Sequence, residues 1–270
     1  MRVTDPSYYL PHVLALEPGR IFTSGANMPL LIRGFCEQTA SEGEYVLKGK
    51  GGERMTAAAF EREMLGCFAA WQVGLNAVEP VLVTVGNEFL QTIKGHPSYD
   101  LVSRSIGHNY GSVFRPGMRE FANNQSLNPK EQEYAKLIFA FDVLIQNTDR
   151  RLEKQNMLTD GNDVIILDHE LAFSFTQSLF PVKESWLIPE ADLYWIRNHY
   201  FFNQLRGKRI DFNTLCVNFQ NIDADFWHSA YSHIPPEWQT GARAVIENHI
   251  NEMVAHVEEF AAHLNRITST

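Results

Sequence analysis

The sequence contains few cysteines, and none of them is paired. The three cysteines, Cys36, Cys67 and Cys216, lie far apart, and none belongs to a Cys-x-x-Cys motif. Three scattered cysteines suit reduced thiols better than a disulfide framework, and the lack of a Cys-x-x-Cys pair argues against a zinc finger. The chain also lacks an apolar signal core after Met1 and any run of about 18 apolar residues that would cross a membrane. We therefore expect a cytoplasmic protein with no membrane partner.

Positive charge is also scarce. The 270 residues include 23 Lys and Arg against 32 Asp and Glu, which gives a formal net charge of −9. A nucleic-acid-binding protein needs a basic face that displaces counterions from phosphate, so no nucleic-acid partner is expected. With 44% hydrophobic and 20% charged residues, the composition is that of a globular protein with a sizeable core. At this length a two-lobed domain is expected.

The first part of the chain, residues 1–88, is rich in β-forming residues. Residues 21–32 are predicted to form a strand, a turn and a second strand, and residues 44–48 a further strand. A helix is predicted over residues 57–71 and another strand over residues 80–85. This pattern indicates a small lobe of strands with one helix. Residues 95–125 contain many Gly, Ser, Asn and Pro and no sustained period, which predicts loop with short helical turns.

Residues 89–270 are predicted to be mostly helical, which makes the fold class α+β. Asn128-Pro129 supplies a helix cap and a first helical position, and a buried apolar stripe follows as far as Ile145. Next comes a hairpin over residues 157–167, with Gly161-Asn162 as its turn. A last helix is predicted over residues 236–267.

The strongest chemical signal surrounds this hairpin. Asp149 lies on the loop before it, Asn156 at its mouth and Asp168 at its far end. If Gly161-Asn162 is the turn, antiparallel pairing puts Asn156 opposite Leu167 and next to Asp168. An amide oxygen and a carboxylate then meet at one edge, and such hard ligands suit Mg²⁺ together with substrate phosphates. Asp149 would lie nearby as an acceptor for a hydroxyl proton.

This loop and hairpin match the catalytic machinery of protein kinases, in which a loop Asp orients the attacking hydroxyl while an Asn and a later Asp hold magnesium. Lys48 ends a predicted strand and Glu63 lies on the following helix. This is the order of the kinase lysine and glutamate that position the nucleotide phosphates. Glu61 competes with Glu63, because both flank the apolar stripe of that helix. Arg150 either steadies phosphate oxygens or pairs with local acids.

Taken together, the motifs resemble the HipA-like kinases, above all the short stand-alone branch of that family. The resemblance rests on Ser24-Gly25-Ala26-Asn27-Met28-Pro29-Leu30, Glu44 to Lys48, Glu63, Gly107 to Ser112, Phe141 to Arg150, Asn156-Met157-Leu158, Leu167-Asp168-His169 and Ile234 to Trp238. It implies a bilobal protein-kinase-like fold, ATP and Mg²⁺ as cofactors, and phosphorylation of a protein Ser or Thr.

The resemblance also implies a role for each site residue. Asp149 would be the base or orienter, Lys48 the phosphate clamp, and Glu63, rather than Glu61, its brace. Asn156 and Asp168 would be the metal ligands. Nucleotide contacts would come from Ser24, Gly25, Ala26, Asn27, Lys48 and Arg150.

Two features depart from the common kinase pattern. Asp149 and Asn156 are seven residues apart where most kinases have five, so the loop is expected to bulge, and Lys154 at the usual position cannot ligate a cation. His169-Glu170 follows Asp168 where eukaryotic kinases have Phe-Gly. Two alternative functions stay open: a pseudokinase that binds nucleotide without turnover, and a kinase for a small-molecule or lipid hydroxyl.

Overall fold

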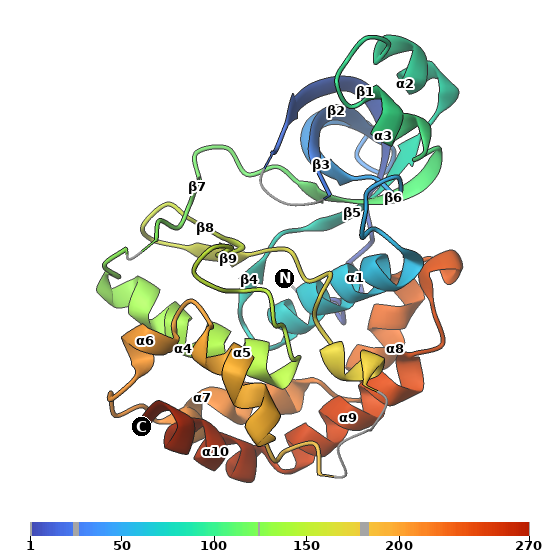
Figure 1. The fold of residues 1–270 in the computed structure, drawn as a ribbon. Helices are drawn as coiled ribbons and strands as arrows, with labels where there is room; N and C mark the ends of the chain where they lie inside the picture. The colour runs from blue at the N-terminus through green and yellow to red at the C-terminus, as the bar shows by residue number, and fades with distance from the viewer. Residues whose placement is uncertain (1, 24–26, 124, 179–183, 270) are drawn as a thin grey trace.

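The computed structural model describes residues 2–23, 27–123, 125–178 and 184–269. The chain forms a β-barrel part, at the top of Figure 1, and a larger, mostly helical part below it. The closed barrel has the strand order β1 (His12–Ile21), β2 (Leu30–Cys36), β3 (Ser41–Lys48), β6 (Gly107–Val113) and β5 (Pro80–Val85). The mixture of helix and sheet agrees with the predicted fold class.

The first two barrel strands differ from the prediction, because they lie mostly on either side of residues 21–32. β1 instead runs through Pro18 and Gly19, which normally interrupt strands. The pairing of β1 with β2 shifts register between Pro18 and Ile21. This irregularity accommodates both residues within the strand. Local composition alone does not predict it.

The strand β6 lies between β3 and β5, although we expected residues 95–125 to be loop and the larger lobe to begin at residue 89. The helices α2 (Asn87–Thr92) and α3 (Tyr99–Ser103) connect β5 to it. Glycine and asparagine in β6 conceal the strand from propensity rules. The packing nevertheless requires a glycine, because a Cβ at Gly111 would lie 2.6 Å from a methyl group of Val83. The barrel part therefore extends to Val113.

The helix α1 (Ala57–Gln72) connects the two parts of the molecule. Thr56 caps it, since its side-chain oxygen accepts from the backbone N–H of Ala59 at 3.2 Å. The helix packs against β6 of the barrel and against α8 (Ala224–His233) of the helical part. Most of its residues are buried, including Glu61 and Glu63. A carboxylate buried in this way needs a partner.

A second sheet, in the larger part, contains the predicted hairpin. Its strand order is β4 (Asn76–Ala77), β9 (Val164–Ile166), β8 (Met157–Thr159) and β7 (Arg119–Glu120). The hairpin has the predicted register, with Met157 opposite Ile166 and Thr159 opposite Val164. Beyond these pairs, the backbone N–H of Leu167 donates to the carbonyl of Asn156 at 3.0 Å. Asn156 therefore lies opposite Leu167, as the turn predicted.

The helix α4 (Pro129–Leu144) precedes the hairpin, where the sequence predicted it. It begins with a capping box, in which Asn128 and Glu131 each bond the other's backbone N–H. Further helices are α5 (Leu193–Arg197), α6 (Phe202–Leu205), α7 (Phe212–Cys216), α9 (Arg243–Ala255) and α10 (Val257–Ser269), with 3₁₀ turns η1 (Ser174–Gln177), η2 (Glu190–Asp192), η3 (Val217–Asn221) and η4 (Pro236–Trp238). Within the described ranges, no helix has the length and apolar character needed to cross a membrane.

The single helix predicted over residues 236–267 is divided in the structure into η4, α9 and α10. Gly241 separates the first two with a φ of 79°. The second break falls at His256, whose φ is −114° and whose ring stacks on Trp186 at 3.8 Å between centroids. This contact joins segments distant in sequence, so helical periodicity could not reveal it.

Candidate active site

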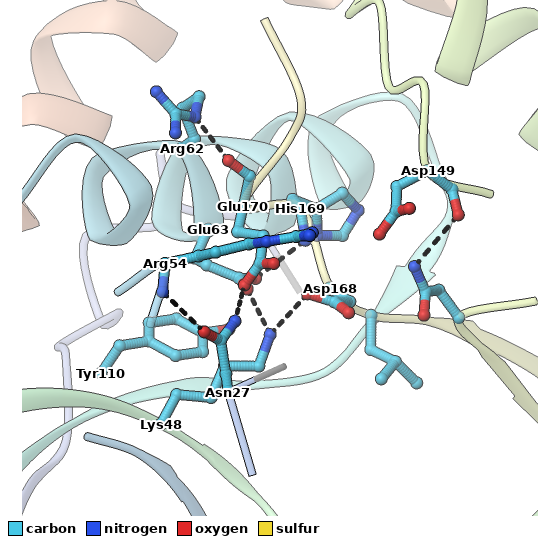
Figure 2. A network of polar contacts seen from close by, with 12 residues as sticks. Asn27, Lys48, Arg54, Arg62, Glu63, Tyr110, Asp149, Asp168, His169 and Glu170 are labelled. Atoms are coloured by element: carbon cyan, nitrogen blue, oxygen red, sulfur yellow. Dashed lines mark hydrogen bonds and ion pairs between the residues drawn. The ribbon is translucent and has the colours of Figure 1, made fainter. Parts of the chain in front are cut away.

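A lysine and two acids meet where the barrel and the helical part adjoin (Figure 2). Lys48, the last residue of β3, forms an ion pair with Glu63 of α1, and its Nζ lies 2.8 Å from Oδ1 of Asp168. The Glu63 side chain is fully buried, and that of Lys48 is 10% exposed. The three residues come from separate segments of the chain. The fold brings together Lys48 and Glu63, which the sequence had suggested as a pair from their order along the chain.

Burial and ion pairing oppose each other in this cluster. Burial raises the pKa of Glu63 to about 7, although the charge of Lys48 acts against the rise. Burial would also raise the pKa of Asp168, but the charges of Lys48 and Lys154 outweigh this effect and hold the pKa below its usual range. Burial would lower the pKa of Lys48, yet Asp168 and Glu63 keep it above its ordinary value. Lys48 and Asp168 are therefore charged at neutral pH.

The structure distinguishes Glu63 from Glu61, which the helical pattern alone did not. Glu63 binds Lys48 and also accepts, through Oε2, from the backbone N–H of His169 at 2.9 Å. Glu61 instead accepts from the hydroxyl and backbone N–H of Thr240. Of the two glutamates, Glu63 is therefore the one that contacts Lys48, as the resemblance implied.

Asn156 and Asp168 both adopt an uncommon backbone conformation at the mouth of the hairpin. Their φ angles are 52° and 64°, in the left-handed region that Asn and Asp tolerate better than most residues. Nδ2 of Asn156 lies 3.5 Å from the backbone oxygen of Asp149, which links the loop to the hairpin. The amide oxygen is then the atom of this side chain that suits a cation. Conformations of this kind cluster at functional sites.

The loop that carries Asp149 is closed by a tight turn. Arg151 and Lys154 exchange two backbone hydrogen bonds of 3.0 Å, and this turn takes up the two additional residues before Asn156. It also returns Lys154 to the site, where its Nζ contacts Asp149 and lies 2.8 Å from Oδ2 of Asp168. No role for Lys154 was predicted from the sequence, whereas the structure puts its charge between two site acids.

Arg150 corrects one prediction. Its side chain is fully buried, forms an ion pair with Asp142 and donates to the backbone oxygen of Asn156. A guanidinium enclosed in this way has no face open to a phosphate, so the alternative of a local ion pair is the one that the geometry supports. Asp142 also accepts from Asn147 at 3.0 Å and His199 at 2.9 Å. Burial would raise the pKa of Asp142, but Arg150 and His199 lower it to about 2.

Glu170 is a site residue that the sequence did not predict. Its side chain accepts from Nδ2 of Asn27, and its backbone oxygen accepts from Nε of Arg62 at 2.6 Å. Asn27 is 6% exposed and also accepts from the backbone N–H of Arg54 at 3.0 Å. These contacts attach one end of the predicted phosphate loop to the segment that follows Asp168 (Figure 2).

The rest of that loop is not described. Ser24, Gly25 and Ala26, which we predicted to contact the nucleotide, lie outside the described residues. For Glu170 the available sequence signal was the His169-Glu170 pair in place of Phe-Gly, which showed a departure from other kinases but no contact.

His169 fixes the distance between α1 and the segment containing Asp168. Its side chain is buried, and burial lowers its pKa to about 3, so the ring is neutral. A Cβ at Gly66 of α1 would lie 2.4 Å from Cγ of His169. The two segments therefore approach as closely as they do because residue 66 has no side chain.

The donor set suits a divalent cation. Carboxylate oxygens of Glu63, Asp168 and Glu170 all lie within 4.8 Å of one another. Hard oxygen ligands of this kind are those that Mg²⁺ prefers. Glu63 is fully buried, and its two oxygens are engaged by Lys48 and by the backbone N–H of His169. Asp168 is 13% exposed and is contacted by two flexible lysine side chains, so Asp168, with Glu170 beside it, is the carboxylate better placed to hold a cation. The amide of Asn156, the residue before β8, would supply a neutral oxygen ligand.

Comparisons with known proteins concern the family and the fold of the chain. The sequence matches the family model described as HipA-like kinase over residues 24–270. No curated protein matches it. Among solved structures, the crystal structure of a Helicobacter pylori proinflammatory kinase, CtkA, is similar with a TM-score of 0.51 and 13% identity, over 96% of this chain and 99% of that chain. At this identity the likeness concerns the fold.

Proposed function

Because this chain belongs to the HipA-like kinase family, we propose that it is an ATP- and Mg²⁺-dependent kinase of protein Ser or Thr hydroxyls. The family and the kinase neighbour support a kinase-type phosphotransferase. The nucleotide, the metal and the acceptor are our proposal. The observation that carries it is the contact of Lys48 with both Glu63 and Asp168. The barrel and the helical part would be the two lobes, with the nucleotide between them.

Each residue near Lys48 has a task in this proposal. Lys48 holds the α- and β-phosphates, and Glu63 keeps its ammonium in place. Asp168 and Asn156 hold Mg²⁺, which neutralises charge on the phosphates when it is bound. Asn27, through its contact with Glu170, keeps the phosphate loop next to Asp168.

Asp149 has a different task, because it lies on the loop and not on the hairpin. Its side chain is 5% exposed. Lys154 contacts the oxygen Oδ2, and a guanidinium nitrogen of Arg151 lies 3.8 Å from Oδ1. It would accept the proton of the acceptor hydroxyl as the new phosphate ester bond forms. Removing its charge should therefore slow transfer without removing a metal ligand.

The variant Asp149→Asn tests this division of tasks. We expect ATP and Mg²⁺ affinity to change little, while phosphoryl transfer falls by about 10² to 10⁴, the usual contribution of general-base assistance. Glu153→Gln is the matched control, because it removes an exposed acid from the same loop and should leave both quantities unchanged. Transfer by Asp149→Asn at the wild-type rate would contradict the assignment.

The acceptor is tested with γ-labelled ATP offered to a dephosphorylated protein mixture and to a panel of small alcohols. Label recovered on protein Ser or Thr supports the proposal. Label confined to small molecules would support the alternative small-molecule kinase. ATP binding without transfer to any acceptor would support a pseudokinase.

A further inference from the structure

Lys154 reaches the site because of the turn that closes the catalytic loop. Its backbone N–H donates to Arg151, and the backbone N–H of Arg151 donates back, both at 3.0 Å. The turn sets the direction of the Lys154 side chain, which is 26% exposed and ends between the carboxylates of Asp149 and Asp168. Asp149 and Asp168 are 5% and 13% exposed, so water screens their repulsion poorly.

The two oxygens of Asp168 are held by two different lysines. Oδ1 lies 2.8 Å from Nζ of Lys48, and Oδ2 lies 2.8 Å from Nζ of Lys154. Lys154 also contacts Oδ2 of Asp149. Burial would lower the pKa of Lys154, but Asp168 and Asp149 raise it above its ordinary value, so the ammonium stays charged. One positive charge thus lies between the two acids.

We propose that the ammonium group of Lys154 lies where a second metal ion would otherwise bind, between Asp149 and Asp168. It thereby limits the nucleotide complex to one divalent ion. The inference rests on the proposed function. Kinase sites commonly hold two ions, one of them through an Asn five residues after the loop Asp. In this chain that position carries Lys154. An ammonium and a divalent ion repel each other, so they do not share Oδ2 of Asp168.

The single ion would be held on the side of Asp168 away from Lys154, at Oδ1. Lys48 contacts this oxygen in the structure and would release it when its ammonium turns to the nucleotide phosphates. Asp168 and Asn156 are the proposed ligands, and Glu170 has a carboxylate oxygen within 4.8 Å of one on Asp168. Lys154 supplies the remaining positive charge from within the chain, so its contribution does not depend on metal concentration. Neutral replacements of Lys154 should therefore make room for an additional ion.

Mn²⁺ is the probe for the test, because unbound Mn²⁺ is counted directly by electron paramagnetic resonance. Wild type, Lys154→Arg, Lys154→Gln and the control Lys136→Gln are titrated with and without a non-hydrolysable ATP analogue. Lys136 pairs with Glu133 on the surface of α4 and lies outside the site. Circular dichroism confirms that each variant is folded.

With the analogue, we expect one Mn²⁺ per chain for wild type, Lys154→Arg and Lys136→Gln, and two for Lys154→Gln. Without nucleotide, Lys154→Gln should bind Mn²⁺ at least about tenfold more tightly than wild type, since a like charge a few ångströms away is removed. Two Mn²⁺ ions per wild-type chain would overturn the inference without any variant. Equal Mn²⁺ affinity of wild type and Lys154→Gln would overturn it as well.

The nucleotide-free arm separates this inference from the proposed function. If wild type binds no ATP analogue while Lys154→Gln still binds Mn²⁺ more tightly than Lys154→Arg, the proposed function fails and the competing cation stands. If the analogue binds with two Mn²⁺ ions, the proposed function is supported and the role of Lys154 is wrong.

Discussion

Replacing Gly66 by alanine should destabilise the protein, although the same change within an ordinary helix stabilises it by about 1 kcal/mol. In α1 the new Cβ would lie 2.4 Å from Cγ and 2.5 Å from Cβ of His169. Both atoms belong to the base of a buried side chain, which cannot move aside as the end of a flexible chain would. Overpacking of this kind costs about 1 to 3 kcal/mol, so a net loss of about 1 kcal/mol is expected.

Urea unfolding of four proteins measures this effect: wild type, Gly66→Ala, His169→Gly and the double variant. The loss caused by Gly66→Ala should disappear or change sign when residue 169 is already glycine, because both the Cβ and the ring that obstruct the new methyl group are then absent. Gly66→Ala should also weaken nucleotide binding, since the backbone N–H of His169 holds Glu63. Stabilisation by Gly66→Ala in the wild-type background, or an equal effect in both backgrounds, would refute the close approach of α1 and His169.

Two further predictions concern the ion pairs. In a γ-phosphate release assay, Lys48→Ala should lose nucleotide affinity or turnover, and Glu63→Gln should show a milder form of the same defect. An equally large defect in Glu61→Gln would contradict the specific pairing of Lys48 with Glu63. Asp142 has a folded pKa of about 2 against 3.8 when unfolded, so its contribution of about 2 kcal/mol is complete above pH 4 and lost as the pH falls toward 2. Asp142→Asn should cost about 3 to 5 kcal/mol by leaving Arg150 unpaired, and should flatten acid unfolding over that range; unfolding curves identical to wild type would contradict it.

The parts of the site that follow from local rules were predictable. The turn at Gly161-Asn162 fixes the hairpin register, and the register puts Asn156 opposite Leu167. The order of a strand-end lysine and a helix glutamate came from the sequence as well. The choice of Glu63 over Glu61 needed the resemblance, because both residues flank the same helical stripe.

Other features depend on contacts that sequence patterns do not contain. Arg150 adjoins Asp149 in sequence, yet its side chain turns inward because Asp142 is buried there. Lys154 joins the site only because a turn reverses the loop. The strand β6 contains glycine where Val83 of the adjacent strand β5 approaches it, so the residue type that hides the strand is also the one that it requires.

The most direct test of the account is ATP binding by wild type and Asp168→Asn, each with Mg²⁺ and with EDTA. Wild type should bind ATP at least about tenfold more tightly with Mg²⁺, since a charge-assisted contact contributes about 1.5 to 3 kcal/mol. Asp168→Asn should lose this dependence, whereas Asp163→Asn, which changes an exposed acid at the hairpin turn, should keep it. Equal affinity of wild type and Asp168→Asn, with and without Mg²⁺, would contradict the assignment of this site as a metal-dependent nucleotide site.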